Sequence, residues 1–292
     1  MEYTLKNRLL TVRVSDHGAE LQSILGADGV EYLWQGDPAY WARHATNLFP
    51  HVGRLTNGTY TWNGNTYELG PHGFARNLDY SLVEQTENTL VLELIDSDGT
   101  RKGYPFAFSY QLIYRLENDT LFVTFRVENR GGEVLPFGLG AHPGFRVPMA
   151  DGLQFTDYKV VFGAPCEPRS LDLSPAAYLA GTDSPYPLTG NAIPLRHDLF
   201  DNDAIILKDM ARSVSLVSDK DPHGVVVSYP DMPYLGLWHT PKTEAPFLCI
   251  EPWATLPAVQ DVVEDFATKE PFFRLAPGGV YENTWTIQVL GQ

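Results

Sequence analysis

Glu251 is the residue whose sequence context points most directly to chemistry. It follows the apolar run Phe247 to Ile250, which is typical of a buried strand. A buried glutamate requires either a salt bridge or a task, because removing an ionised carboxylate from water is costly. Desolvation would also favour its protonated form and increase its basicity, which suits a general base. Glu251 is therefore a candidate for proton transfer.

Two histidines could work with this carboxylate. His142 lies in the stretch Gly138 to Phe145, where small residues leave room for a ligand, and His72 lies between turn-forming residues in the segment Gly70 to Arg76. Histidine exchanges protons near neutral pH, so either imidazole could act as an acid or a base. The structural alternatives are that His142 bonds a nearby carbonyl and that His72 is only a turn residue.

An arginine and several aromatic residues could bind a sugar. Arg54 is set among apolar residues, and its guanidinium fork suits hydroxyls or a carboxylate, although a structural ion pair is the commoner use of such an arginine. Aromatic faces on which a pyranose ring could stack are offered by Trp238, Trp253, Phe74 and Phe145. Aromatic residues at strand ends are, however, more often part of a core.

Composition excludes several classes of function. The formal net charge of -15 argues against nucleic acid and anionic membranes as partners, since both bind basic patches. Only Cys166 and Cys249 are present, far apart and in no metal-like spacing, which argues against a disulfide framework and a zinc site. No phosphate-binding loop, dinucleotide fingerprint, zinc-binding helix motif or nucleophile elbow occurs. The chemistry that remains is proton transfer without a cofactor.

The amino terminus has no basic region followed by an apolar run, and no later segment approaches membrane-spanning length. We therefore expect a cytoplasmic protein. Two glycosylation sequons, which begin at Asn57 and Asn118, are then expected to be turns and not sugar acceptors.

The elements that must position these residues are mostly strands. Alternating patterns from residue 80 to 128, with polar turns between them and no helical period, predict an antiparallel sandwich. Asn63-Gly64 predicts a two-residue hairpin turn, and Asp37-Pro38 predicts a short helix that ends near Arg43. The proline-rich region from 151 to 195 is expected to make excursions over a sheet face. With no break in composition, we expect one large all-β domain over residues 1–292.

Five short motifs, taken in order, resemble the aldose 1-epimerase (galactose mutarotase) family, and in particular its shorter bacterial branch. The resemblance runs over essentially the whole chain. It implies a large antiparallel β-sandwich, the galactose mutarotase-like supersandwich, with no metal or organic cofactor and a shallow cleft that holds a hexose. The motifs are Phe49-Pro50-x-x-Gly53-Arg54, His72-Gly73-Phe74-Ala75-Arg76, Gly140-x-His142-Pro143-x-Phe145, Leu199-Phe200-x-x-Asp203-Ala204 and Ile250-Glu251-Pro252-Trp253.

The resemblance also implies a role for each matching residue. Glu251 would be the base that removes the proton of the anomeric hydroxyl, and His142 the acid that protonates the ring oxygen. His72 would assist on the same side of the sugar, while Arg54 and Asp203 would bind hydroxyls. Ring opening, rotation about the C1–C2 bond and reclosure would then give the other anomer.

Two departures leave the sugar open. Longer galactose-specific members usually have an Asn-Arg pair where this chain has Gly53-Arg54, so a preference for galactose is not implied. The segment His72 to Arg76 is also similar to glucose-6-phosphate 1-epimerases. Arg76 and Arg43 could take a phosphate, although Arg76 could equally pair with Asp79, and the acidic chain favours a neutral sugar.

Two other classes of function stay open, namely a non-catalytic carbohydrate-binding sandwich and a hydrolase that uses Glu251 with an aspartate. The expected partner is a small-molecule sugar, and both a monomer and a homodimer are compatible with the sequence.

Overall fold

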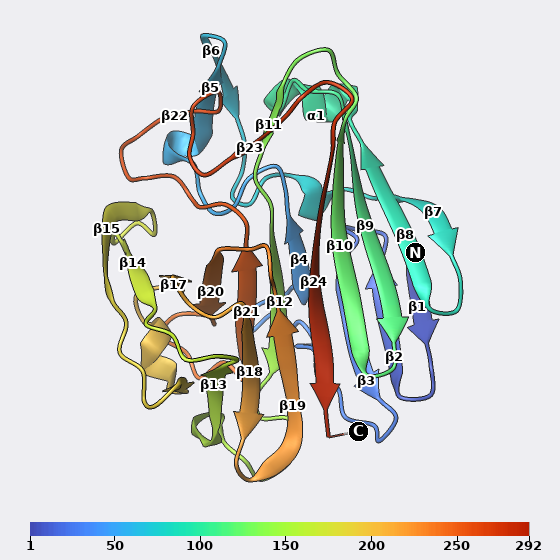
Figure 1. The fold of residues 1–292 in the computed structure, drawn as a ribbon, viewed down its shortest axis with the longest axis vertical. Coiled ribbons are helices and arrows are strands. Elements are labelled where there is room, and N and C mark those ends of the chain that lie inside the picture. Colours follow the sequence, from blue (N-terminus) through green and yellow to red (C-terminus); the bar gives the residue numbers. More distant parts are fainter. Residues whose placement is uncertain (292) are drawn as a thin grey trace.

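The computed structural model describes residues 1–291, and within them the strands form two large antiparallel sheets and three small ones (Figure 1). The predicted all-β class is confirmed. One short α-helix, α1 (Asp98–Gly103), and four 3-10 helices interrupt the described strands. The 3-10 helices are Thr56–Gly58, Ala75–Asn77, Phe155–Asp157 and His197–Phe200.

The larger sheet has nine strands. In spatial order these are β16 (Ala192–Pro194), β13 (Tyr158–Phe162), β18 (Ser213–Ser218), β19 (Asp221–Ser228), β24 (Val280–Leu290), β10 (Thr120–Asn129), β9 (Phe108–Glu117), β8 (Thr89–Ile95) and β7 (Ser81–Gln85). Burial alternates strictly along β10, where Leu121, Val123, Phe125 and Val127 face the core. This period of two is the pattern expected of a sheet with only one face in the core.

The second sheet has seven strands and carries the candidate site. In spatial order these are β15 (Leu179–Pro185), β14 (Arg169–Leu173), β17 (Ile205–Lys208), β20 (Tyr234–Trp238), β21 (Phe247–Trp253), β12 (Gly140–Arg146) and β4 (Ala45–Leu48). Every residue of β21 is buried. Leu248 and Ile250 belong to the main core, which also holds residues of the nine-stranded sheet, whereas Phe247, Cys249 and Trp253 belong to two smaller clusters. The two faces of β21 therefore have different neighbours, and the face that does not contact the main core is available for a site.

Three small sheets flank the large ones. The first contains β1 (Glu2–Lys6), β2 (Leu10–Ser15) and β3 (Leu21–Gly26). The second contains β22 (Glu264–Asp265), β5 (Thr59–Trp62) and β6 (Asn65–Glu68), and the third contains β11 (Leu135–Phe137) and β23 (Phe273–Leu275). The predicted hairpin is confirmed, because β5 pairs with β6 across Asn63 and Gly64, whose φ angles are 50° and 76°. Asn57 and Asn118 also have positive φ, as expected of turns.

Two local predictions are wrong. No helix forms after Asp37; the chain makes a single turn in which Asp37 Oδ1 accepts the Ala39 N–H (2.9 Å) and the Asp37 carbonyl accepts the Trp41 N–H (3.0 Å). The region from 151 to 195 is also more regular than expected, since it contains β13 to β16 at the edges of both large sheets. Prolines are tolerated at sheet edges, where a strand can lack one ladder hydrogen bond.

Among the described residues, none of the helices has the length and apolar character to cross a membrane.

Candidate active site

A cavity of about 350 Å³ brings together residues from distant parts of the sequence. This volume falls within the range of about 300–1,000 Å³ that is typical of small-molecule sites. A larger surface hollow of about 630 Å³ lies beside Lys6–Leu9 and Leu116–Asn118, but no histidine lines it. The smaller cavity is lined by Trp41, Gly53, Arg54, His72, Arg76, His142, Leu173, Ala177, Asp203, Ala204, Ile206, Trp238, Pro241, Glu251, Trp253 and Pro257.

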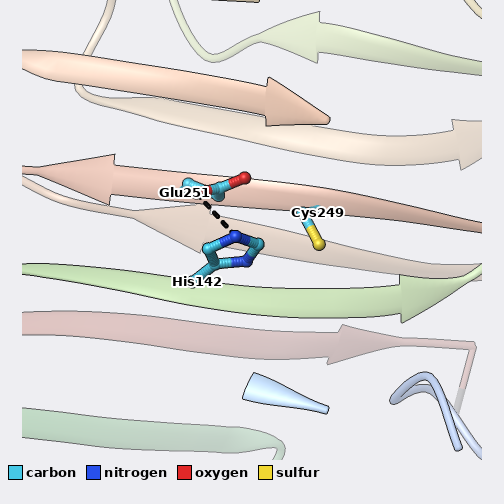
Figure 2. Close-up of side chains that lie close together, drawn as sticks. All are labelled: His142, Cys249 and Glu251. Atoms are coloured by element: carbon cyan, nitrogen blue, oxygen red, sulfur yellow. Dashed lines mark ion pairs between the residues drawn. The ribbon is translucent and has the colours of Figure 1, made fainter. Parts of the chain in front are cut away.

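Strand pairing places His142 against Glu251. Gly140 pairs with Trp253 and Gly144 with Cys249, so the same antiparallel register sets His142 opposite Glu251 on neighbouring strands β12 and β21. His142 Nε2 lies 3.3 Å from Glu251 Oε2. Figure 2 marks this ion pair with a dashed line. Both residues are buried, with exposed fractions of 8% and 2%. The structure thus forms an imidazole–carboxylate pair within the cavity wall.

Burial changes the protonation of both groups. Burial, and next the negative charge of Asp203, raises the pKa of Glu251 well above its usual value. Burial lowers the pKa of His142 to about 3. Each shift disfavours the charged form of its own group, so the pair as a whole is held uncharged, with one proton between Oε2 and Nε2.

His72 is fixed by reciprocal hydrogen bonds with Gly53. The backbone N–H of Gly53 donates to the ring atom His72 Nδ1 (3.1 Å). The backbone N–H of His72 donates to the Gly53 carbonyl (2.7 Å). Burial lowers the pKa of His72 well below its usual value, so the ring is neutral and carries its proton on Nε2. Its backbone has a φ of 63°, a conformation that non-glycine residues rarely adopt and that often marks functional sites. The His72 and His142 rings meet edge to face, with centroids 5.6 Å apart.

Trp41 lines the cavity, and the sequence analysis missed it. Its indole stacks on the His142 ring with centroids 4.8 Å apart and planes inclined by 24°. Trp238 meets the same imidazole edge-on at 5.7 Å. Within residues 1–291, His142 Nδ1 has no hydrogen-bond partner, so stacking and the contact with Glu251 orient this ring. Asp37-Pro38, which predicted a short helix up to Arg43, was the local clue, but it carried no information on what this segment would contact.

The remaining predicted binding residues are Arg54, Asp203, Arg76, Trp238 and Trp253, and all five line the cavity. Arg54 Nη1 donates to the Ala176 carbonyl (2.9 Å). Asp203 has a φ of 80°, and its Oδ1 accepts the Ala204 N–H at 2.9 Å.

Arg76 does not form an ion pair with Asp79, which was the structural alternative to a role in binding. Asp79 bonds instead to His17 Nδ1 (2.7 Å). Arg76 Nε is buried and has no hydrogen-bond partner among the described residues, and desolvation lowers the pKa of its guanidinium. Arg43, by contrast, is engaged with the backbone carbonyl of Arg76 (3.2 Å) and with Asn77 Oδ1 (2.8 Å). Of the two arginines, Arg76 is the one that lines the cavity.

Phe145 was predicted to stack on the sugar, and the structure contradicts this. Its exposed fraction is 0%, it belongs to the main core, and it pairs with Leu248 on the far face of β12. Side chains alternate between faces along a strand, so Phe145 points away from His142. Phe74 also packs into the core, edge-on to Phe49 at 6.1 Å.

Two glycines leave room for the side chains at the base of the cavity. A Cβ on Gly140 would lie 2.6 Å from Trp253 Cδ1, and one on Gly236 would lie 3.1 Å from Trp253 Cζ2 and 3.2 Å from Glu251 Cβ. Glycine at these positions of β12 and β20 lets the strand between them, β21, carry a large indole and a carboxylate on the same face.

Comparison with known proteins shows the family and the fold of this chain. The family model for aldose 1-epimerase matches residues 1–263. The chromosomal protein LacX of Lactococcus lactis subsp. lactis is 32% identical over 300 residues, which cover 99% of this chain and 100% of LacX. The crystal structure of a galactose mutarotase related enzyme from Lactobacillus acidophilus has a TM-score of 0.93 and 38% identity, with 99% of this chain and 97% of that chain covered.

A galactose mutarotase-like protein from Lactobacillus casei also has a TM-score of 0.93, with 29% identity, and 99% of this chain and 100% of that chain are covered. The fold agreement therefore extends over nearly the whole chain. The protein belongs to the aldose 1-epimerase family.

Proposed function

We propose that this protein is a mutarotase, which interconverts the α and β anomers of a hexose by acid–base ring opening and closure. The observation that carries the proposal is the buried pair of His142 Nε2 and Glu251 Oε2, 3.3 Å apart in a cavity large enough for a sugar. A base and an acid this close suit the anomeric hydroxyl and the ring oxygen, because both of those oxygens are bonded to the same anomeric carbon.

The pair exchanges protons with the sugar and holds the same number of protons at the end of the reaction as at the start. Sugar binding draws the pair into its ionised form, with a Glu251 carboxylate and a His142 imidazolium. Glu251 takes the proton of the anomeric hydroxyl while His142 gives its proton to the ring oxygen, and the bond from C1 to the ring oxygen breaks to give the aldehyde. After rotation about C1–C2, His142 removes the proton of the released hydroxyl and Glu251 protonates the carbonyl oxygen. The ring closes as the other anomer, and the pair regains its initial state.

Other side chains of the cavity hold the sugar in place. Neutral His72 donates from Nε2, Asp203 accepts from hydroxyls, and Arg54 donates to them. Trp238 and Trp253 offer apolar faces to the pyranose ring. Such positioning confines the ring so that its two reacting oxygens meet the acid and the base.

Arg76 favours a second candidate substrate, a hexose 6-phosphate. Its buried Nε lacks a partner among the described residues, and a guanidinium binds phosphate well because several N–H groups point the same way. The two substrates are separated by comparing glucose with glucose 6-phosphate in wild type and Arg76→Gln. If the phosphate is bound by Arg76, the variant loses kcat/KM for glucose 6-phosphate only; a similar loss for both sugars would exclude this assignment.

Polarimetry of freshly dissolved α-glucose or α-galactose tests the proposed activity. We expect wild type to accelerate the approach to anomeric equilibrium and Glu251→Gln to lose about 10²- to 10⁴-fold in rate. The proposal fails if wild type accelerates no aldose, free or phosphorylated. A carbohydrate-binding protein without activity would keep its sugar affinity in Glu251→Gln and have no rate to lose, while a hydrolase would release an aglycone from glycosides.

We further propose that the protein acts in the cytoplasm without a cofactor, as a monomer or a homodimer. Fractionation of its host cells and light scattering of the purified protein test the first and last of these statements.

A further inference from the structure

We propose that His142, Cys249 and Glu251 together form a binding site for a soft divalent cation such as Zn²⁺ or Cd²⁺. One nitrogen, one sulfur and one oxygen donor of these residues all lie within 4.8 Å of one another. Figure 2 shows the three side chains gathered in one place, with the ion pair between Glu251 and His142 dashed. The site is distinct in composition from the proton-transfer pair because it includes the thiol, which the proposed reaction does not use.

Backbone pairing fixes the three donors in place. Cys249 and Glu251 occupy alternate positions on β21, so their side chains leave the strand on the same face. Gly144 on β12 pairs with Cys249, and the same register places His142 beside Glu251. Ligands that project from two hydrogen-bonded central strands are held more precisely than ligands on loops.

The spacing suits a tetrahedral ion after a small contraction. Bonds to zinc are about 2.3 Å from sulfur and about 2.0–2.2 Å from nitrogen or oxygen, which puts tetrahedral ligand atoms roughly 3.3–3.7 Å apart. Side-chain rotations that bring the atoms together by about 1 Å satisfy this geometry. His142 and Glu251 also line the cavity, which gives an ion a path of entry to these donors.

The donor set selects soft ions over hard ones. A thiolate and an imidazole favour zinc and cadmium, whereas magnesium and calcium prefer oxygen ligands. Binding displaces two protons, one from the Cys249 thiol and one from the His142–Glu251 pair. The dication then balances one thiolate and one carboxylate, so the buried site carries no net charge.

The spacing of Cys166 and Cys249 argues against a zinc site made of both cysteines, but not against a site that contains Cys249 alone. Cys166 lies between β13 and β14 and is half-buried, whereas Cys249 is fully buried beside the pair. The residues that complete the site, His142 and Glu251, come from elsewhere in the sequence and in the fold. Cys166 therefore provides a matched control cysteine.

Cadmium titration with ultraviolet detection of the cadmium–thiolate absorption band tests the site directly. In wild type and Cys166→Ser we expect a band that saturates at one ion per chain. In Cys249→Ala and Cys249→Ser we expect no band, and circular dichroism establishes that each variant is folded. A band that persists without Cys249, a band that disappears without Cys166, or no band in wild type would overturn the proposal.

The Glu251→Gln variant is an independent check that keeps the thiol. It should retain the band but weaken cadmium affinity by about tenfold or more, since an anionic ligand is replaced by a neutral one. An unchanged affinity would show that the ion binds the thiol alone and would refute the three-residue site. This test decides the matter even if both Cys249 variants fail to fold.

One consequence rests on the proposed function, because an ion on Nε2 and Oε2 would occupy the atoms that move protons. Zn²⁺ should then inhibit mutarotation in wild type and in Cys166→Ser. For Cys249→Ser, inhibition is measured relative to the rate of that variant without metal, and it should require at least about tenfold more zinc. If no mutarotase rate exists in any variant, the proposed function fails while the cadmium band still decides the metal site. If wild type is active and Cys249→Ser is inhibited at the same zinc concentration, the site proposed here is wrong.

Discussion

The indole of Trp41 lies flat against the imidazole of His142, with ring centroids 4.8 Å apart. This contact joins the turn after Asp37 to strand β12 and helps to exclude water from the His142–Glu251 pair. Trp41 thereby both orients the His142 ring and maintains the burial that lowers its pKa.

Replacing Trp41 with alanine should weaken both effects. A stacked aromatic pair contributes about 0.5–1.5 kcal/mol, so we expect kcat to fall by up to about tenfold in Trp41→Ala and much less in Trp41→Phe. The His142 pKa should rise from about 3 towards 6.5, which NMR titration of the imidazole measures. Trp62→Ala, on β5 outside the cavity, is the control. An unchanged His142 pKa in Trp41→Ala would show that the stack does not control solvation.

The pH dependence of kcat/KM should be broad. The active pair holds one proton, which is lost only as pH rises through the raised pKa of Glu251, and a second proton is gained only as pH falls through about 3. Activity is therefore expected to decrease as pH rises through the raised pKa of Glu251, to decrease below about pH 3, and to be flat between these two limits. Polarimetric rates corrected for spontaneous mutarotation measure this profile. A midpoint near 4.5 or 6.5, the ordinary values for the two groups, would contradict a shared proton.

The sequence pointed to the titratable residues that line the cavity better than to its aromatic walls. Glu251 could be selected because an apolar strand ending in a carboxylate is a local pattern, and the two histidines because small residues and turns surround them. Phe145 was wrongly expected to stack on the sugar because no strand was predicted in the stretch around His142. Once it is recognised as strand β12, alternation puts His142 and Phe145 on opposite faces.

Contacts between distant segments could not be predicted in this way. Nothing in the sequence around Trp41 indicates that it will stack on His142, because the contact depends on how β12 and the turn after Asp37 pack. Asp79 is near Arg76 in the sequence, yet its partner is His17, which comes from another segment. Such pairings are set by the packing of whole sheets, which local propensity does not encode.

Glu251→Gln should stabilise the protein above the usual pKa of glutamate. Because the folded-state pKa of Glu251 is raised, the folded protein retains a proton that the unfolded chain releases above about 4.5. The stability contributed by this group is present below that pH and declines as pH rises, by about 1.4 kcal/mol per pH unit until the raised pKa is reached. Urea unfolding of wild type and Glu251→Gln over a series of pH values should show an advantage for the variant that grows until pH reaches the raised pKa of Glu251.

Glu93 provides a control of opposite sign. Burial tends to raise its pKa, but hydrogen bonds from Ser109 and Gln111 outweigh this and lower it. The stability that Glu93 contributes is present above its usual pKa and is lost on acidification, so Glu93→Gln should lose stability relative to wild type as pH rises through that range. If both variants showed the same pH trend, the burial of Glu251 would not be the cause.

Glycine-to-alanine substitutions test how closely the strands must approach at the base of the cavity. In Gly140→Ala the new methyl would lie 2.6 Å from the rigid Trp253 indole, so the indole or β12 must shift, and kcat should fall together with stability. In Gly236→Ala the nearest contacts are 3.1 Å and 3.2 Å, which a displacement of a few tenths of an ångström relieves. We therefore expect a smaller loss of activity in Gly236→Ala than in Gly140→Ala.

Gly132→Ala is the control, because no atom lies within 4 Å of the added methyl. Its kcat and urea midpoint should match those of wild type. Overpacking typically costs about 1–3 kcal/mol, so Gly140→Ala should be clearly separated from this control in urea unfolding. Equal activity and stability in all three variants would mean that Trp253 moves freely, and its indole would then be unsuited to hold a sugar ring in a fixed position.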